Sequence, residues 1–295
     1  MVSIVIPTYN RRTMVTQAVD CALAQERIDF ELIVVDDGST DDTYDVLKRR
    51  LDGESRARIL RKQNGGTASA RNLGIARARG SWTAFLDSDD LWEARYLESQ
   101  IAALDAQPWA DLVVGNATYV NQERRADSLF ADPDFRPPTS LQAMCSGAWA
   151  LPSAIVVRTE IARALGFTNR YRIIEDTEFL LRFHARGHHA IFNPERLASW
   201  RRPEGAGEVA KTESSLAIEA EMLDLLHSNL HLAPNPEAAE HRFYSLHRCA
   251  AKRLVEQRRY GEARTHLRVW CRTRPLRLRP RIYYLRSLLS PLRAR

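Results

Sequence analysis

The sequence has little cysteine and no long apolar segment. Its four cysteines are scattered without a Cys-x-x-Cys pair, so neither a structural zinc site nor a disulfide framework is expected. The longest uncharged run, residues 137–157, contains three prolines and three serines and is a poor membrane span. The first residues lack the basic and apolar regions of a signal peptide. These absences favour a reducing, cytoplasmic location, with any membrane contact being peripheral on the inner face.

Charge is distributed unevenly along the 295 residues. Residues 242–295 carry 15 Arg and one Lys against two Glu, a net of +14, so residues 1–241 carry −8 of the formal net charge of +6. The composition, 44% hydrophobic and 27% charged, is that of a globular protein. We therefore expect two regions: an α/β domain over residues 1–205 and a basic α-helical region over residues 206–295.

Short apolar runs alternate with helical patterns through the first half of the chain. This alternation predicts right-handed βαβ units and a mostly parallel sheet flanked by helices, with the ligand site at the carboxyl ends of the strands. Farther on, residues 121–150 are predicted to be irregular, residues 202–207 a linker, and residues 214–289 helical. The predicted strands are 3–6, 31–35, 58–60, 82–86, 112–115, 154–157, 189–192 and 197–200, and the predicted helices of the first region are 13–24, 42–51, 67–78, 93–106 and 177–185.

Carboxylates follow two of the predicted parallel strands. Asp36 and Asp37 follow one strand, and Asp87 and Asp89 follow another within the run Asp-Ser-Asp-Asp. Crowded carboxylates repel one another unless a cation lies between them, and oxygen ligands suit Mg²⁺ or Mn²⁺. The alternative, that these acids only cap the following helices, is weak for Asp87 and Asp89 because their spacing brings both side chains near one point.

Several sequence blocks occur in an order typical of one enzyme family. They are VSIVIPTYNR, ELIVVDDGSTDDT, Asn64-Gly65-Gly66, Ala70-Arg71-Asn72-x-Gly74, FLDSDD and Glu175-Asp176. With these blocks in this order, the chain resembles the GT-A glycosyltransferase superfamily, specifically the inverting family-2-like enzymes. The resemblance covers about residues 1–205. The resemblance implies a metal-dependent transfer of a sugar from a nucleotide-diphosphate sugar, with a UDP-sugar favoured.

The resemblance also implies which residues bind the donor and the metal ion. Asp37 is implied to accept hydrogen bonds from uracil or ribose, and Arg71 to contact the base or the phosphates. Asp89, together with Asp87, is implied to bind Mn²⁺ or Mg²⁺, because Asp87-Ser88-Asp89 matches the family's Asp-x-Asp motif. The full set implied to bind the nucleotide sugar is Pro7, Thr8, Tyr9, Asn10, Asp37, Gly65, Arg71, Asp87 and Ser88.

The acceptor side of the reaction is implied by later residues. Asp176 is implied to be the base that takes the acceptor proton, and Glu175 to orient the acceptor or Asp176. Asp176 also opens a predicted helix, whose dipole favours a carboxylate. Arg201 and Arg202 are candidates for diphosphate contacts, and Trp149 for stacking on an acceptor sugar, although buried packing of Trp149 is equally compatible with the sequence.

The expected acceptor is the hydroxyl of a glycan or of a lipid-linked glycan, in polysaccharide or glycolipid synthesis. The Gln-x-x-Arg-Trp motif of processive synthases is absent, so a non-processive enzyme is expected. Two alternatives are an inactive nucleotide-sugar-binding scaffold and a sugar nucleotidyltransferase. The nucleotidyltransferase needs a glycine-rich loop after the first strand, and residues 7–12 contain no glycine.

The basic tail lies outside this resemblance. Nucleic acid is not expected as its partner, because no recognition motif is present. The apolar residues among the arginines of residues 276–295 suit an interfacial helix that contacts anionic lipid. Contact with another subunit, and simple solvation of the arginines, remain alternatives.

Overall fold

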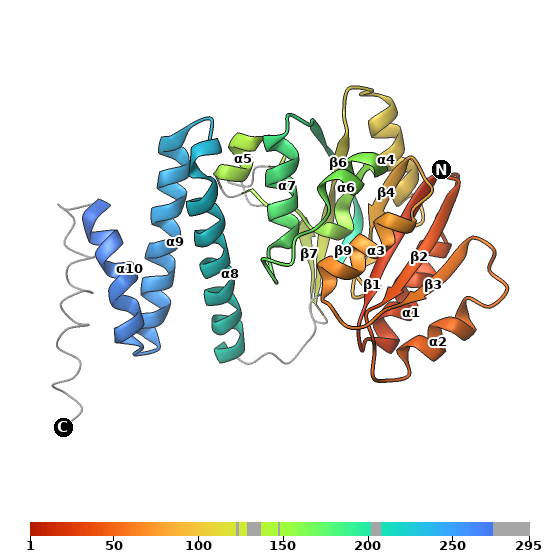
Figure 1. Cartoon of the computed structure of the whole chain (residues 1–295), viewed down its shortest axis with the longest axis horizontal. Helices are drawn as coiled ribbons and strands as arrows, with labels where there is room; N and C mark the ends of the chain where they lie inside the picture. Colours follow the sequence, from red (N-terminus) through yellow and green to blue (C-terminus); the bar gives the residue numbers. More distant parts are fainter. Residues whose placement is uncertain (122–123, 129–136, 147, 202–207, 274–295) are drawn as a thin grey trace. The chain divides into compact units, whose positions relative to one another are not determined.

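The computed structural model describes residues 1–121, 124–128, 137–146, 148–201 and 208–273 (Figure 1). The chain divides into two compact units, residues 1–144 with 148–204 and residues 145–147 with 205–295. The first unit is an α/β structure, and the described part of the second, apart from residues 145–146, is helical.

The first half of the α/β unit alternates strands and helices, as the sequence pattern predicts. Every residue of β1 and β2 is buried, as expected for central parallel strands. In chain order the elements are β1 (Val2–Thr8), α1 (Arg12–Leu23), β2 (Phe30–Asp36), α2 (Thr43–Arg50), β3 (Ala57–Arg61), α3 (Thr67–Arg77) and β4 (Trp82–Phe85).

The second half of the unit is less regular. Four of its strands and helices were not predicted from the sequence: the short strand β5, the hairpin strand β7 and the short helices α5 and α6. β7 and α5 lie where residues 121–150 were expected to be irregular. The elements are β5 (Leu91–Trp92), α4 (Tyr96–Asp105), β6 (Leu112–Asn121), β7 (Arg124–Ser128), α5 (Leu141–Cys145), a 3₁₀ turn (Pro152–Ala154), β8 (Ile155–Arg158), α6 (Thr159–Leu165), α7 (Glu175–Ala185) and β9 (Ala190–Arg201).

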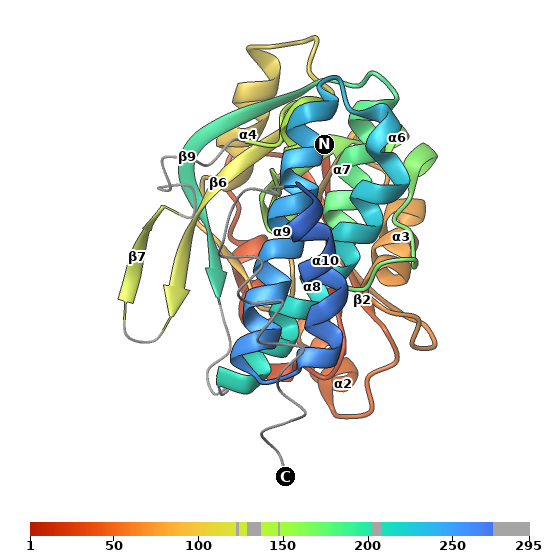
Figure 2. The same cartoon turned by 90° about the vertical axis from the view of Figure 1, so that its left-hand side faces the viewer.

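These strands form one mixed sheet in the order β3-β2-β1-β4-β8-β6-β9-β5, with β7 beside β6 (Figure 2). The pairs β3–β2, β2–β1, β1–β4 and β6–β9 are parallel. β8 lies between β4 and β6 and is antiparallel to both. β5 pairs antiparallel with β9, and β7 pairs antiparallel with β6. The predicted α/β class is confirmed, and β1, β2 and β4 end at the same edge of the sheet.

The long strand β9 differs from the two short strands that were expected. Pro194 lies within it and cannot donate a ladder hydrogen bond. The pairing of β6 with β9 shifts register on both sides of Asn116, and the Asn116 side chain donates to the Pro194 carbonyl at 3.1 Å. A bulge at this point therefore accommodates the proline within one continuous strand.

Helix α3 packs very closely on strand β1 at Gly74. A Cβ atom at this position would lie 2.3 Å from Cγ1 of Val5, which is shorter than any real carbon contact. Only glycine therefore permits this approach of helix to strand. The contact fixes α3 against the sheet, and Arg71 lies one turn earlier on the same helix.

The second unit contains α8 (Glu208–Asn229), a 3₁₀ turn (Leu230–Leu232), α9 (Pro236–Glu256) and α10 (Tyr260–Thr273). Asn235 caps α9, because its side chain accepts a hydrogen bond from the Ala238 amide. Helices α9 and α10 enclose a core that includes Leu254 and Leu267. Within the described residues, no helix is both long and apolar enough to cross a membrane. The predicted helix 281–289 and the rest of residues 274–295 lie outside the described residues.

Candidate active site

One pocket of about 380 Å³ lies where β1, β2 and β4 end. Its walls combine strand-end residues with residues from the first turns of α3 and α7, elements far apart in the sequence. Most of the residues implied to bind the nucleotide sugar therefore meet at one place. The described residues that line it are Pro7, Thr8, Tyr9, Arg11, Asp37, Thr67, Ala70, Arg71, Asp87, Ser88, Asp89 and Glu175.

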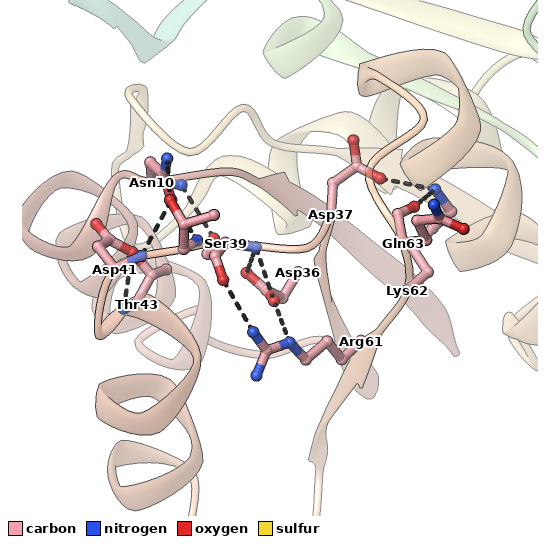
Figure 3. Close-up of polar contacts among 10 residues, drawn as sticks. Asn10, Asp36, Asp37, Ser39, Asp41, Thr43, Arg61, Lys62 and Gln63 are labelled. Carbon is pink, nitrogen blue, oxygen red and sulfur yellow. Dashed lines mark hydrogen bonds and ion pairs between the residues drawn. The ribbon is translucent and has the colours of Figure 1, made fainter.

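Asn10 and Asp36 organise the loops beside this pocket (Figure 3). The Asn10 side chain accepts from the Thr40 amide at 2.8 Å, and its backbone amide donates to the Ser39 hydroxyl at 3.0 Å. Asp36 is fully buried, accepts from the Ser39 amide and pairs with Arg61 at 3.2 Å. Asn10, which the resemblance places at the nucleotide base, is thus committed to the loop after β2.

Asp37 turns away from Asp36 and holds the loop that precedes α3 (Figure 3). Its carboxylate accepts from Nζ of Lys62 at 2.7 Å and from the amide of Gly66 at 2.7 Å. The Gly65 amide also donates to it, at 3.1 Å. These three donors take three of the about four acceptor positions of a carboxylate, so one position stays open to a nucleotide.

The backbone of both glycines takes part in this contact, and the conformation of Gly66 favours glycine. Gly66 has φ of +86°, a conformation that side chains with a Cβ rarely adopt. A Cβ on Gly65 would lie 2.8 Å from Nζ of Lys62. Gly66 lets the backbone approach Asp37, and the expectation that the two glycines admit a nucleotide stays a prediction.

Arg71 lies at the centre of the site rather than at its surface. Its side chain is 2% exposed, and its guanidinium pairs with Asp87 at 2.6 Å and with Glu175 at 2.8 Å. The guanidinium also lies 5.2 Å from the centre of the Phe167 ring. Burial would lower the pKa of Arg71, but the two carboxylates raise it, so the group stays charged. Arg71 thereby joins the end of β4 to the start of α7.

Asp176 lies next to this ion-pair network, at the start of α7. Burial raises its pKa to about 7, the Glu175 carboxylate adds to the rise, and Arg71 opposes it. These effects outweigh the helix dipole, which was expected to favour the carboxylate. The side chain remains partly exposed and accepts from the Thr177 amide at 2.6 Å. Asp176 is not among the described pocket-lining residues, whereas Glu175 is.

The carboxylates after β4 have different partners. Asp87 pairs with Arg71, and Asp89 pairs with Arg11 across the pocket. Asp90 is buried, accepts from the Ser153 hydroxyl, and has a pKa well above its ordinary value because of burial and the nearby Asp87. Asp90 thus fixes the turn on which Asp87 and Asp89 stand.

Asp87 and Asp89 are the described residues best suited to hold a divalent cation. Both are carboxylates on one pocket wall, and their side chains are 23% and 22% exposed. Hard cations such as Mg²⁺ and Mn²⁺ prefer oxygen ligands and commonly complete their shell with substrate oxygens and water. Among the described residues, no group of three or more His, Cys, Asp or Glu side chains converges as a metal site. The donor set therefore fits a cation shared with a phosphate-bearing ligand.

Arg201 supports the metal-motif turn from β9. Its Nε donates to the Asp89 carbonyl, Nη1 donates to Gln17, and its amide donates to Asp90 at 3.1 Å. Its expected contact with a diphosphate stays a prediction. Trp149 lies 6.0 Å from Trp200, measured between ring centres and with the rings tilted by 60°.

Some predicted residues cannot be placed, and some pocket residues were not predicted. Arg202 lies outside the described residues. Arg11, Thr67 and Ala70 line the pocket, yet none of them was assigned to the site from the sequence. Arg11 directly follows the strand-end motif PTYN, and its position after a parallel strand was the available signal.

Comparison with known sequences adds a family context. The model of the family described as glycosyl transferase family 2 matches residues 3–161. Glycosyltransferase GlyG of Streptococcus pneumoniae serotype 4 is 27% identical over 240 residues, which is 76% of this chain and 78% of GlyG. A hyaluronan synthase of Pasteurella multocida is 42% identical over 98 residues, or 33% of this chain and 10% of that protein. The chain thus spans only a small part of some of its relatives.

Comparison with solved structures supports the fold. TarS of S. aureus, residues 1–349 in complex with UDP-GlcNAc, superposes with a TM-score of 0.62 at 18% identity, covering 97% of this chain and 79% of that one. The mannosyltransferase PcManGT of Pyrobaculum calidifontis, in complex with GDP-Man and Mn²⁺, gives a TM-score of 0.64 at 21% identity, covering 98% and 84%. At these identities the likeness concerns the fold.

Proposed function

The chain belongs to glycosyl transferase family 2, and from that premise we propose an inverting, metal-dependent transfer of a sugar from a nucleotide-diphosphate sugar to a hydroxyl group. The observation that carries this proposal is the Asp87–Arg71–Glu175 ion-pair network within one pocket. It connects carboxylates suited to a metal–diphosphate complex with acids suited to proton transfer. We assign this chemistry to residues 1–205 and an accessory role to residues 206–295.

On the donor side, we assign Asp89 and Asp87 as ligands of Mn²⁺ or Mg²⁺. A bound divalent cation would neutralise the charge that develops on the leaving diphosphate. Pro7, Thr8 and Tyr9 form the wall beside these ligands, and the Tyr9 side chain is sufficiently exposed to stack against a nucleobase. Asp37 contributes by holding the Lys62–Gly66 loop in place.

On the acceptor side, we assign Asp176 as the base. A pKa of about 7 allows its carboxylate to take the acceptor proton near neutral pH and suits general-base catalysis. The acceptor oxygen then bonds to the anomeric carbon while the bond from that carbon to the diphosphate oxygen breaks, which inverts the configuration. Glu175 orients Asp176 and is itself held by Arg71.

The substrates are proposed by analogy with the relatives. TarS in its structure is complexed with UDP-GlcNAc and PcManGT with GDP-Man, so nucleotide sugars are the donor class, with UDP-sugars favoured here. The similarity to a hyaluronan synthase supports a glycan acceptor, free or lipid-linked, in polysaccharide or glycolipid synthesis.

A thermal-shift screen tests the donor class. We expect one UDP-, dTDP- or GDP-sugar to raise the unfolding temperature in the presence of Mn²⁺, because a ligand at about 100 times its Kd stabilises the fold by about 2.7 kcal/mol. EDTA should remove the shift. If no nucleotide sugar changes the unfolding temperature at millimolar concentration, the proposed donor class is wrong.

The variant Asp176→Asn then separates binding from chemistry. It should retain the thermal shift with the matching donor and lose sugar transfer, since the amide cannot accept the acceptor proton. Near-wild-type turnover by this variant would exclude Asp176 as the base while leaving the donor class intact.

A further inference from the structure

Arg11 is a pocket-lining cation to which the proposed chemistry assigns no role. It stands between β1 and α1, its side chain is 40% exposed, and its guanidinium pairs with Asp89. The two residues are 78 positions apart in the sequence, so the pair is a tertiary contact across the pocket. It joins the arginine to the carboxylate that is best placed to bind a divalent cation.

The backbone at Arg11 is fixed although its side chain is exposed. The preceding residue, Asn10, has φ of +51° and is held by hydrogen bonds to Ser39 and Thr40. The following residue, Arg12, is the first of helix α1. The base of the Arg11 side chain is therefore anchored, while its guanidinium is exposed and lines the pocket.

The second cation of the pocket, Arg71, cannot move in this way. It is 2% exposed and pairs with two carboxylates, so its departure would leave two buried or half-buried charges without compensation. The partner of Arg11 is a single, partly exposed carboxylate. An ion pair of this kind is worth about 0–1 kcal/mol, which a stronger partner can readily replace.

We propose that Arg11 exchanges partners when the donor binds: it pairs with Asp89 in the free protein and with the donor's diphosphate in the complex. This inference rests on the proposed function, because it requires Asp89 to become a metal ligand. Once Asp89 is engaged in that way, Arg11 loses its anionic partner and faces a like charge. A guanidinium forms charge-assisted, bidentate hydrogen bonds with phosphate oxygens, which offer it the better alternative.

The exchange predicts effects of opposite sign on two ligands, measured by calorimetry with Mn²⁺ alone and then with UDP at saturating Mn²⁺. Arg11→Ala should bind Mn²⁺ about three- to fivefold more tightly, because a competing ion pair worth up to about 1 kcal/mol is removed. The same variant should bind UDP about tenfold or more weakly, because a charge-assisted phosphate contact is lost. GDP replaces UDP as the probe if the wild type prefers it.

Arg12→Ala is the matched control. Arg12 carries the same charge one residue later, but it pairs with Asp42, both side chains are at least half exposed, and it is not among the described lining residues. Both affinities of this variant should stay within about twofold of wild type. Arg11→Gln, which keeps the side-chain length without the charge, replaces Arg11→Ala if circular dichroism shows that the alanine variant is unfolded.

The possible outcomes separate this inference from the proposed function. If the wild type binds both Mn²⁺ and the nucleotide and Arg11→Ala behaves like Arg12→Ala, the partner exchange is overturned and the proposed function stands. A loss of affinity for Mn²⁺ in Arg11→Ala would also overturn it. If the wild type binds neither probe, the proposed function and the exchange both fail.

Discussion

The carboxylates that follow β2 and those that follow β4 are held by different kinds of partner. Asp37 accepts from two backbone amides and one lysine, and Asp36 accepts from a backbone amide and pairs with Arg61. Asp87 and Asp89 also pair with arginine side chains, but without the backbone amides that hold Asp36 and Asp37. The first pair of carboxylates forms part of the loop framework, and the second lies at the working surface of the pocket.

This difference distinguishes carboxylates that hold the loops in place from carboxylates that are available to a ligand. Backbone amides belong to the loop itself and cannot leave Asp37 without a rearrangement of residues 62–66. A side-chain partner can change its rotamer at little cost when it is exposed, as Arg11 is, but not when it is buried, as Arg71 is. Asp89 is therefore the carboxylate whose charge is most available to a ligand, and Asp87 combines a ligand position with a rigid support.

The largest effect is expected from Arg71→Met, which removes the buried support and leaves Asp87 and Glu175 uncompensated. Removal of one partner from a buried ion pair typically costs about 3–5 kcal/mol of the free energy of unfolding. Urea denaturation at neutral pH measures this loss. Arg50→Met is the matched control, since Arg50 and Asp20 are each nearly half exposed, and it should cost no more than about 1 kcal/mol.

The double variant Arg71→Met with Glu175→Gln tests the origin of that loss. If the uncompensated Glu175 charge is the main cause, the double variant should be more stable than Arg71→Met alone, and the two changes should not be additive. Additive losses would mean that packing of the arginine, for example against Phe167, carries its contribution instead.

The next effect contrasts the two strand ends directly. Asp37→Ala strands two amides and a lysine and should lower the free energy of unfolding by about 1–3 kcal/mol in the presence of EDTA. Asp89→Ala removes one partly exposed ion pair and should lower it by about 1 kcal/mol or less.

Metal-dependent binding should be affected in the opposite order: the loss should be larger in Asp89→Ala than in Asp37→Ala. Asp89→Ala should lose metal-dependent UDP binding by calorimetry, whereas Asp37→Ala should keep its dependence on Mn²⁺ even if its affinity falls. Equal destabilisation by the two variants, or unchanged Mn²⁺ affinity in Asp89→Ala, would remove the distinction between framework and working carboxylates.

The sequence was sufficient for the parts of the fold that local patterns determine. The apolar runs from β1 to β4 and the helices between them are visible as periodicity, and the strand-end position of Asp37 and Asp87 follows from it. The strand at residues 154–157 was predicted, but the antiparallel place of β8 between β4 and β6 was not, because this pairing depends on a long connection rather than on the residues of β8. Likewise, the bulge at Asn116 that carries β9 past Pro194 has no local signal.

Within the site, the sequence predicted which residues line the pocket better than it predicted what each of them contacts. The site assignments made from the sequence included nine of the twelve described lining residues. They could not show that Arg71 reaches Glu175, which lies 104 residues away, or that Asp37 is occupied by the glycines expected to face a nucleotide. Such pairings are decided by tertiary packing, here by the close contact of α3 with β1 at Gly74.

The smallest predicted effect concerns the pH dependence of activity. It depends on Asp176, which lies beside the network in which Arg71 joins Asp87, after β4, to Glu175 on α7. Asp176 must be deprotonated to act as a base, so kcat/KM should rise with pH through about pH 7, the pKa to which burial and Glu175 raise it. Glu175→Gln removes a neighbouring negative charge, which lowers the pKa of Asp176 and moves this limb to lower pH. Glu178→Gln, on the same helix but paired with Arg182, should leave the limb in place.

The stability contributed by Asp176 should fall as pH rises, whereas activity should rise. The free energy of unfolding therefore gives an independent check of this group. Because the pKa of Asp176 is higher in the folded chain than the value of about 3.9 for an unfolded one, protonation favours folding. Its contribution is fully present below about pH 4 and is lost as pH rises through about 7. Asp176→Asn should therefore flatten this part of the stability profile and exceed the wild type in stability at pH 8. A parallel profile in the variant would show that the raised pKa belongs to another group, and an activity limb unmoved by Glu175→Gln would break the link between the two ends of the Arg71 network.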